Sequence, residues 1–284
     1  MIRCNRRKLM NMLAASMREA PIAGTKVPQV HSCIIRYSTD GVLETTSLVR
    51  DGVSSVHSLR FTTDTPPSED GMIVVPSIVS LLGVLKMHKA DTVSLKQTQE
   101  KLKITSSNKQ TTILANLHAI AYPGARSSVL IWEQQSKRIM GKVMKHQETG
   151  NLLYIGENDE VFEPALELDA IAASVLAEAF SFDSMNSQNK GLWSLEISPG
   201  GEVFVVSGED MKGRTVCKIY EANTLAKGLK IELNGGLHSL FTTHLSQDTR
   251  ISLFDFRDKN QGWRVVFSSD DGMVVQIGRD NHDN

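Results

Sequence analysis

The chain has 284 residues, of which 40% are hydrophobic and 22% are charged, and its formal net charge is −1. These proportions are ordinary for a globular protein and exclude a disordered or collagen-like chain. The longest apolar run, in residues 71–85, is interrupted by Pro76, Ser77 and Ser80, so it falls short of the ~18 apolar residues of a membrane span.

The net charge hides an asymmetry along the chain. Residues 1–120 contain 15 Lys and Arg against 9 Asp and Glu, whereas residues 121–284 contain 16 against 23. The first part therefore has a net charge of +6 and the second a net charge of −7. This division is typical of a surface for a polyanion in the first part, although uneven scatter of charge explains it equally well.

The first 120 residues predict a helix, strands, a second helix and further strands. In the first helix, Arg6–Glu19, apolar residues recur at helical spacing, and Asn5 is expected to cap its start. Pro76 is expected to open the second helix, whose apolar residues follow the i, i+3, i+4, i+7 pattern. Strands are predicted at Val30–Tyr37, Val42–Val49, Val53–Thr62, Met72–Val75, Thr92–Gln97, Lys101–Ser106 and Gln110–Leu117.

The second part of the chain repeats this order. Residues 122–158 fit neither periodicity and are interpreted as a connector with one strand at Ile139–Lys145. After a strand at Val161–Leu168, Asp169 is expected to cap a helix, Ala170–Phe180. A helix at Gly236–Leu245 follows, and strands are predicted at Leu192–Ser198, Glu202–Ser207, Thr215–Glu221, Leu229–Leu233, Arg250–Phe256, Gly262–Ser268 and Met273–Ile277.

An internal duplication of one α+β unit explains the repetition. We therefore predict an α+β fold with two tandem domains. The first covers residues 1–123, an interdomain connector covers residues 124–158, and the second domain covers residues 159–284.

The order of elements resembles that of the DNA sliding clamps. The segment GMIVVPSIVSLLGVLKMHKADTVSLKQTQEKLKITSSNKQTTILANLHAIAYP (Gly71–Pro123) looks like a clamp domain's second helix, its three closing strands and a terminal aromatic-proline pair. The segment LSQDTRISLFDFRDKNQGWRVVFSSDDGMVVQIG (Leu245–Gly278) is similar to the end of a proliferating-cell-nuclear-antigen chain. The two-domain length, the connector sequence GARSSVLIW and the polar tail RDNHDN are also similar to clamps of tailed bacteriophages.

The resemblance implies two clamp-type (processivity-fold) domains, each with antiparallel sheets and two helices. Because clamp rings contain six such domains, a chain with two is expected to close head to tail as a homotrimer. The implied function is that of a DNA polymerase processivity factor, which encircles duplex DNA and tethers the replicative polymerase. The expected partners are duplex DNA, a DNA polymerase, a clamp loader ATPase and further copies of the chain.

The expected location is intracellular, in the cytoplasm at a nucleoid or viral replication site. Three scattered cysteines predict no disulfide framework, and no apolar stretch of a secretory signal follows the basic start of the chain. The subunit contacts are expected at the edge strands Gln110–Leu117 and Thr215–Glu221, since sheets continue across clamp interfaces.

In clamps the helices line the hole, and phosphate contacts from Lys and Arg give affinity without base readout. Both first-part helices are apolar on one side and basic on the other, which fits this role, although such faces are often merely solvated. The second-part helices lack basic residues, so either the first domain holds DNA largely alone or nearby loops contribute. The candidate DNA-binding residues are Arg6, Arg7, Lys8, Arg18, Lys86, Lys89, Lys190, Lys212 and Arg214.

Clamps also have an apolar pocket beneath the connector, where polymerases and loaders insert a short peptide. Carried across by position, the pocket residues are Leu48, Val49, Val53, Val129, Leu130, Ile131, Trp132, Val275, Gln276 and Ile277. Trp132 either anchors a partner or pins the connector to the body. Trp193 and Trp263 lie in strand patterns and are expected in the core.

We expect no catalysis, cofactor or metal. The histidines form neither an HExxH motif nor a Cys/His ligand set, and the sequence has no P-loop or GxGxxG. The segment LNGGLHSLF is superficially similar to a Gly-rich oxyanion loop, but no GxSxG accompanies it. Three alternatives stay open: a ring-free monomeric processivity subunit, a checkpoint-type heteromeric clamp and, from another class, a hydrolase with an unrecognised site.

Overall fold

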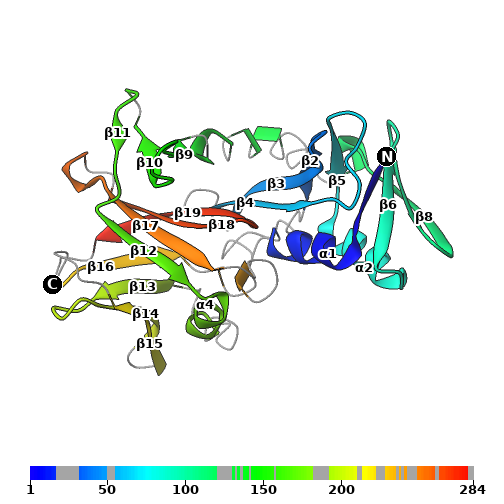
Figure 1. The fold of residues 1–284 in the computed structure, drawn as a ribbon. Helices are drawn as coiled ribbons and strands as arrows, with labels where there is room; N and C mark the ends of the chain where they lie inside the picture. The colour runs from blue at the N-terminus through cyan, green and yellow to red at the C-terminus, as the bar shows by residue number, and fades with distance from the viewer. Residues whose placement is uncertain are drawn as a thin grey trace. The chain divides into compact units, whose positions relative to one another are not determined.

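The chain divides into two compact units (Figure 1). Unit 1 comprises residues 1–52 and 57–137, and unit 2 comprises residues 53–56 and 138–284. The computed structural model describes residues 1–16, 32–49, 55–119, 130–131, 133–134, 137–140, 142–156, 158–181, 192–209, 213–221, 228–234, 237, 240–241, 248–259 and 262–280.

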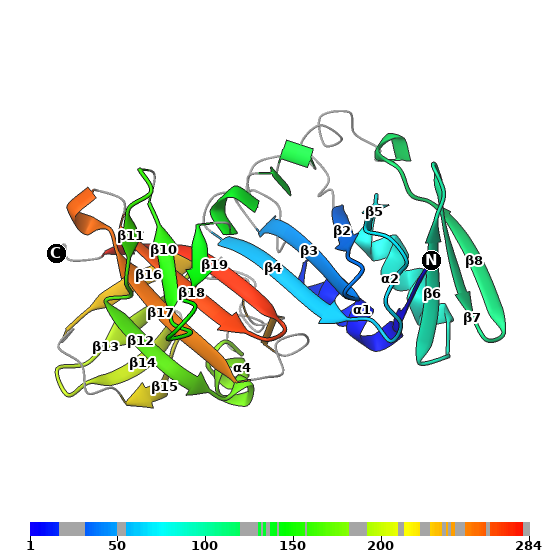
Figure 2. The same ribbon diagram turned by 45° about the horizontal axis from the view of Figure 1, so that its top comes forward.

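The described residues of unit 1 form two antiparallel sheets, which pack with helices α1 and α2. One sheet has the order β1-β6-β7-β8, with β1 at Ile2–Asn5, β6 at Thr92–Gln97, β7 at Lys101–Ser106 and β8 at Lys109–Leu114. The other has the order β4-β3-β2-β5, with β2 at Cys33–Tyr37, β3 at Val42–Val49, β4 at Ser55–Thr62 and β5 at Gly71–Val75. Helices α1 (Arg6–Ala15) and α2 (Ile78–Met87) lie side by side between the sheets (Figures 1 and 2), and a 3-10 turn covers Leu117–Ala119.

Unit 2 repeats this arrangement and adds a third sheet. The order β12-β17-β18-β19 joins Leu166–Ile171, Thr249–Asp255, Trp263–Ser269 and Gly272–Asp280. The order β15-β14-β13-β16 joins Gly213–Glu221, Glu202–Glu209, Leu192–Ile197 and Lys230–Asn234. The additional sheet, β11-β10-β9, joins Val161–Phe162, Leu152–Ile155 and Val143–Lys145; helix α4 covers Ala173–Ala179, and a 3-10 turn covers Arg257–Lys259.

The two units follow one plan in chain order, as the duplication predicts. Each has a first strand that joins the sheet of the last three strands, β1 with β6–β8 and β12 with β17–β19. A helix follows each first strand, and four further strands are then paired in the order 4-3-2-5 within the unit. In unit 2 the last of these four, β16, also pairs with β19. The α+β prediction is therefore confirmed.

Each unit has its own apolar core. In unit 1, the inward faces of α1 and α2 and of the β1-β6-β7-β8 sheet are buried, and the residues that carry this core include Leu9, Met12, Leu13, Ile78, Leu81, Leu85, Ile2, Cys4, Val93 and Leu95. In unit 2, Phe180 stacks on Phe241 and packs edge-on against Trp193. Trp193 and Trp263 are 3% and 2% exposed, which confirms that both belong to the core.

The local sequence predicts one helix cap correctly and another wrongly. The side chain of Asn5 accepts a hydrogen bond from the backbone N–H of Lys8, so this predicted cap is confirmed. Ser77, one residue after Pro76, caps α2 by accepting from the N–H of Ser80. The predicted cap at Asp169 is wrong, because Asp169 lies inside β12 and pairs with Arg250, and α4 begins only at Ala173.

The strands differ from the sequence prediction in three parts of the chain. Strand β1 was not predicted, because its tetrapeptide is too short to show a period. The strand expected at Val161–Leu168 is interrupted after Phe162 and resumes at Leu166. Within the segment assigned to the connector, β9 and β10 are paired strands of unit 2.

The three cysteines are free thiols. Burial raises the pKa of Cys4 and of Cys33 to about 12, so both remain protonated members of the core. Among the described residues, no helix is long and apolar enough to cross a bilayer.

Candidate nucleic-acid interface

Helices α1 and α2 present a cationic surface on the side away from the core. The side chains of Leu9 and Leu13 are buried on the inner side of α1, whereas those of Arg7 and Lys8 are exposed. Lys86 in α2 and Lys89 just beyond its end are exposed in the same way. These four side chains, which we call the helix cations, form no ion pair within the described part of the chain.

Arg6 differs from the helix cations because its guanidinium is used inside unit 1. Its Nε donates to the carbonyl oxygen of Ala90 at 2.8 Å, and Nη1 donates to that of Leu85 at 3.4 Å. The backbone N–H of Arg6 also donates to the carbonyl of Asp91 at 2.7 Å. Since the C-terminal end of a helix carries partial negative charge, Arg6 stabilises the end of α2 and ties α1 to it.

His88 fixes the same end of α2 to the β7–β8 hairpin. Its side chain is fully buried, with Nδ1 2.8 Å from Ser106 Oγ and Nε2 3.0 Å from Thr111 Oγ1. Burial, with the nearby charges of Lys109 and Arg6, lowers the pKa of His88 below its usual 6.5. Through these two hydrogen bonds the neutral imidazole stabilises the end of α2 at which Lys86 and Lys89 lie.

The remaining candidate DNA-binding residues lie outside the described residues or in unit 2. Arg18, Lys190 and Lys212 lie outside the described residues. Arg214 lies on β15 in unit 2, with Nη2 3.5 Å from Glu196 Oε2. The exposed residues of α4 are Ser174 and Glu178, so this helix offers no cation.

The predicted pocket residues are distributed over both units. Leu130 and Ile131 are 42% and 50% exposed, whereas Val275 and Gln276 are buried in β19. Ile277 is half-buried in the same strand. Leu48 and Val49 belong to β3, but their side chains, like all of Val53, Val129 and Trp132, lie outside the described structure.

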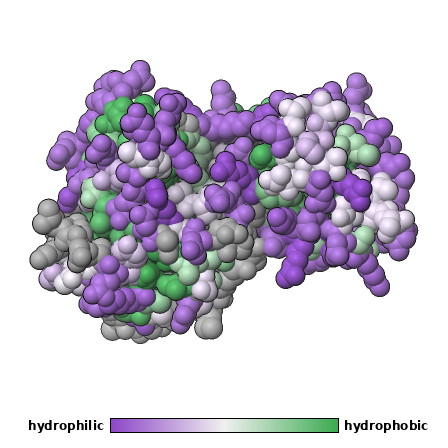
Figure 3. All heavy atoms as spheres, viewed as in Figure 1, coloured by the Kyte–Doolittle hydropathy of each residue, from purple (hydrophilic) through white to green (hydrophobic). Residues whose placement is uncertain are grey.

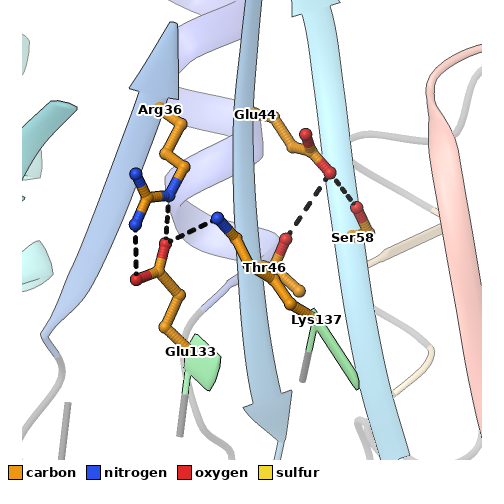
Figure 4. Close-up of polar contacts among 6 residues, drawn as sticks. All are labelled: Arg36, Glu44, Thr46, Ser58, Glu133 and Lys137. Atoms are coloured by element: carbon orange, nitrogen blue, oxygen red, sulfur yellow. Dashed lines mark hydrogen bonds and ion pairs between the residues drawn. The ribbon is translucent and has the colours of Figure 1, made fainter. Parts of the chain in front are cut away.

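An ion pair that the sequence did not reveal anchors the segment after Ile131 to unit 1. Glu133, only 7% exposed, accepts from Arg36 Nε at 2.5 Å and from Nη2 at 2.9 Å (Figure 4). Lys137 Nζ lies 3.4 Å from the same carboxylate. Because Arg36 and Glu133 are 97 positions apart, no local pattern indicates the contact.

A groove of about 420 Å³ lies beside this anchor on the outer side of β2, β3 and β5. In it, Glu44 accepts from Ser58 and Thr46 (Figure 4), and Asp70 accepts from the backbone N–H of Thr39 at 2.7 Å. No group of three His, Cys, Asp or Glu residues suited to a metal ion occurs within the described ranges. The groove therefore offers hydrogen-bonding groups on a sheet surface.

Comparison with known proteins identifies the fold. No protein-family model matches the sequence, and no curated protein matches it either. Solved structures of sliding clamps do match over essentially the whole chain. The beta sliding clamp of C. crescentus matches with a TM-score of 0.57 and 12% identity, over 98% of this chain and 65% of its own.

Two further clamps match equally well. The DNA polymerase III beta subunit of Thermotoga maritima has a TM-score of 0.57 and 13% identity, and the match covers 100% of this chain and 65% of its own. A. fulgidus PCNA, solved with the C-terminal region of FEN-1 bound, has a TM-score of 0.57 and 11% identity, with 100% and 98% covered. The chain thus spans about two thirds of the length of these bacterial clamps, and it has the sliding-clamp fold.

Substitutions of Arg6 and Arg7 distinguish an arginine that stabilises unit 1 from one that is only exposed. We predict that Arg6→Ala lowers the free energy of unfolding by about 1.5–3 kcal/mol, because hydrogen bonds from a charged group to two carbonyls are lost. Arg7→Ala, the neighbouring exposed arginine, changes it by less than about 0.5 kcal/mol. Urea unfolding followed by circular dichroism measures both, and equal losses would contradict the assignment.

The burial of His88 predicts a pH dependence of stability. The imidazole of His88 binds a proton less tightly in the folded chain than in the unfolded chain, because its pKa is lowered on folding. The contribution of His88 to the free energy of unfolding is therefore fully present above about pH 7 and decreases as the pH falls through the usual His pKa of 6.5. His88→Gln should remove part of this decrease, measured as the urea midpoint at pH 7.5 and pH 5.5. His118→Gln, at an exposed position, is the matched control, and an identical decrease in all three proteins would refute the prediction.

Proposed function

We propose that the chain is a DNA sliding clamp, a processivity factor that encircles duplex DNA and tethers a DNA polymerase to it. The observation that carries the proposal is the combination of the clamp fold with the unpaired helix cations Arg7, Lys8, Lys86 and Lys89. Phosphate contacts of this kind give affinity without base readout, so the protein moves along DNA while ring closure prevents its release. The proposed role is mechanical and requires no catalytic residue.

The two units correspond in this proposal to two clamp domains, and three chains supply the six domains of a ring. Strands β8 and β15 lie at the edges of their sheets and each carries an exposed apolar residue, Leu114 (59%) and Val216 (53%). An edge strand offers unpaired backbone groups to a neighbouring chain. We therefore assign the head-to-tail subunit contact to β8 of one copy and β15 of the next.

The partner site is proposed around Leu130 and Ile131. The Helicobacter pylori beta clamp has been solved bound to a DNA ligase peptide, and A. fulgidus PCNA with the C-terminal region of FEN-1. In this chain, the exposed apolar side chains of Leu130 and Ile131 lie three and two residues before Glu133, whose bond to Arg36 holds the segment against unit 1. Apolar side chains on an anchored segment suit a short peptide from a polymerase or a clamp loader.

One observation favours a second candidate, a ring-free subunit that binds DNA through unit 1 alone. The exposed residues of α4 carry no positive charge, unlike those of α1 and α2. A ring in which only half of the lining is basic must hold DNA through three of its six domains. The oligomeric state separates the two candidates.

We predict a trimer of about 94 kDa, three times the 31.3 kDa of one chain, by light scattering on a sizing column. Leu114→Lys or Val216→Lys should shift the population toward monomer, because each places a charge at a proposed contact. Val161→Lys, at an edge position that is 60% exposed in the third sheet, is the matched control. A monomer at all concentrations would favour the ring-free subunit.

Neutralising the helix cations should weaken DNA binding without unfolding the protein. For Arg7→Gln/Lys8→Gln/Lys86→Gln/Lys89→Gln, we predict that the slope of log K against log salt becomes less negative by up to about 0.9 for each lost phosphate contact. Fluorescence anisotropy with a labelled linear duplex measures the slope. The control is Lys218→Gln/Lys230→Gln/Lys259→Gln, three exposed lysines that are held in ion pairs. Equal slopes in the helix variant and the wild type would contradict the assignment.

A further inference from the structure

The sheet β1-β6-β7-β8 has a second cationic surface on the side away from the helices. Residues alternate along its strands, so that Leu95, Leu102 and Ile104 are buried and their neighbours are exposed. Figures 1 and 2 show the sheet at one end of unit 1, with α1 and α2 on its inner side only. We call the outer side the basic sheet face, and its cations are Arg3, Lys96, Lys101 and Lys103.

The cations of the basic sheet face are concentrated and unpaired. Lys96 and Lys103 lie directly opposite each other on β6 and β7, and Lys101 is two residues along the same strand. Like charges directly opposite each other destabilise a sheet. The four strands contain no Asp or Glu, and these four cations have no ion pair in the described ranges. No carboxylate within the four strands offsets the repulsion between these cations.

The equivalent sheet of unit 2, β12-β17-β18-β19, is covered on its outer side by another part of the same unit. There the third sheet, β11-β10-β9, covers the outer side of β17–β19 through an aromatic cluster in which Tyr154 contacts Phe254 and Phe256. On that side Arg250 is paired with Glu167 and Asp169 at 3.4 and 2.6 Å, and the guanidinium of Arg264 lies over the ring of Phe256. In unit 2 the outer side of the sheet is therefore covered by strands of the same chain, whereas in unit 1 the outer side of the equivalent sheet is exposed and positively charged.

We propose that the basic sheet face binds the phosphate backbone of a second segment of duplex DNA, outside the segment that the helix cations contact. The polar side chains beside these cations are hydroxyls and an amide: Thr112 and Gln110 are exposed, and Ser94 and Thr105 are half-buried. Lys and Arg together with Ser, Thr and Gln are the side chains that contact phosphate oxygens in protein–DNA complexes. The face has the chemistry of a phosphate-binding surface without base readout.

The composition of the face favours a duplex over the other polyanions. The four strands contain no aromatic residue on which the bases of a single strand would stack. An acidic protein partner needs apolar anchors, and the exposed apolar residue here is Leu114, at the margin on β8. In Figure 3 hydrophilic side chains dominate the margin of unit 1 over β8. Duplex DNA, with its high density of charge, fits a broad face of this kind.

This surface adds to the proposed clamp function without depending on ring closure. A second contact on unit 1 raises the affinity of the open chain for DNA and holds a duplex against the outside of the protein. Its test therefore uses linear DNA, on which a ring gives no topological retention, and the full chain throughout.

The experiment measures anisotropy of a labelled 30-base-pair duplex of arbitrary sequence over a salt series. For Lys96→Gln/Lys101→Gln/Lys103→Gln we expect binding at least roughly tenfold weaker at low salt and a salt slope less negative by up to about 2.7. The melting temperature should stay equal or rise, because the repulsion between Lys96 and Lys103 is removed. Combined with the helix-cation variant, the loss should be larger than in either variant alone.

The control Lys218→Gln/Lys230→Gln/Lys259→Gln removes the same charge and should bind as the wild type does. Wild-type affinity and slope in the Lys96/Lys101/Lys103 variant would overturn the proposal and leave an acidic protein as the partner of this face. Tighter binding of a 30-nucleotide single strand than of the duplex would also overturn it. A failure of the clamp function itself would show elsewhere, as a monomeric mass or as an unchanged slope in the helix-cation variant.

Discussion

The apolar stripes of α1 and α2 are buried on the same side of unit 1, and this burial determines which side chains are left for a partner. Full burial of a residue such as Leu9 or Leu81 contributes about 1.5–3 kcal/mol. Repulsion between two exposed cations in water is about 1 kcal/mol or less. Apolar burial therefore sets the orientation of both helices, and the positive charges follow onto the outer side, where no carboxylate of the described chain neutralises them.

The two units share one backbone plan but differ in how their outer sheets are covered and how their charges are paired. Unit 2 closes its outer sheet with β9–β11 and pairs the charges near it, as Arg250 does with Glu167. Unit 1 leaves both its helices and its outer sheet cationic. The same backbone plan thus supports one unit with exposed, unpaired cations and another in which Arg250, on the outer side of its sheet, is held in ion pairs.

Periodicity predicted the elements whose pattern is local. The helical spacing that includes Leu9 and Leu13, the cap at Asn5 and the alternation along β7 all appear in the structure. It failed where the decisive contact is distant in sequence. Asp169 was assigned to a helix cap, yet Arg250, 81 residues later, holds it in a strand. The assignment of Arg6 to DNA stays a prediction, and the hydrogen bonds that its guanidinium donates to Leu85 and Ala90 had no signal in the local sequence. The pair of Arg36 and Glu133 has no local signal at all.

The measurement that tests the central claim most directly compares retention of the full chain on circular and linear duplex DNA of the same length and sequence. The protein is incubated with nicked circular DNA at low salt, the salt is raised to screen phosphate contacts, and one half of the sample is cut once before gel filtration. Encirclement predicts that protein remains on the intact circle and is released from the cut one. Equal release from both at high salt would contradict encirclement and leave a protein that binds DNA by charge alone.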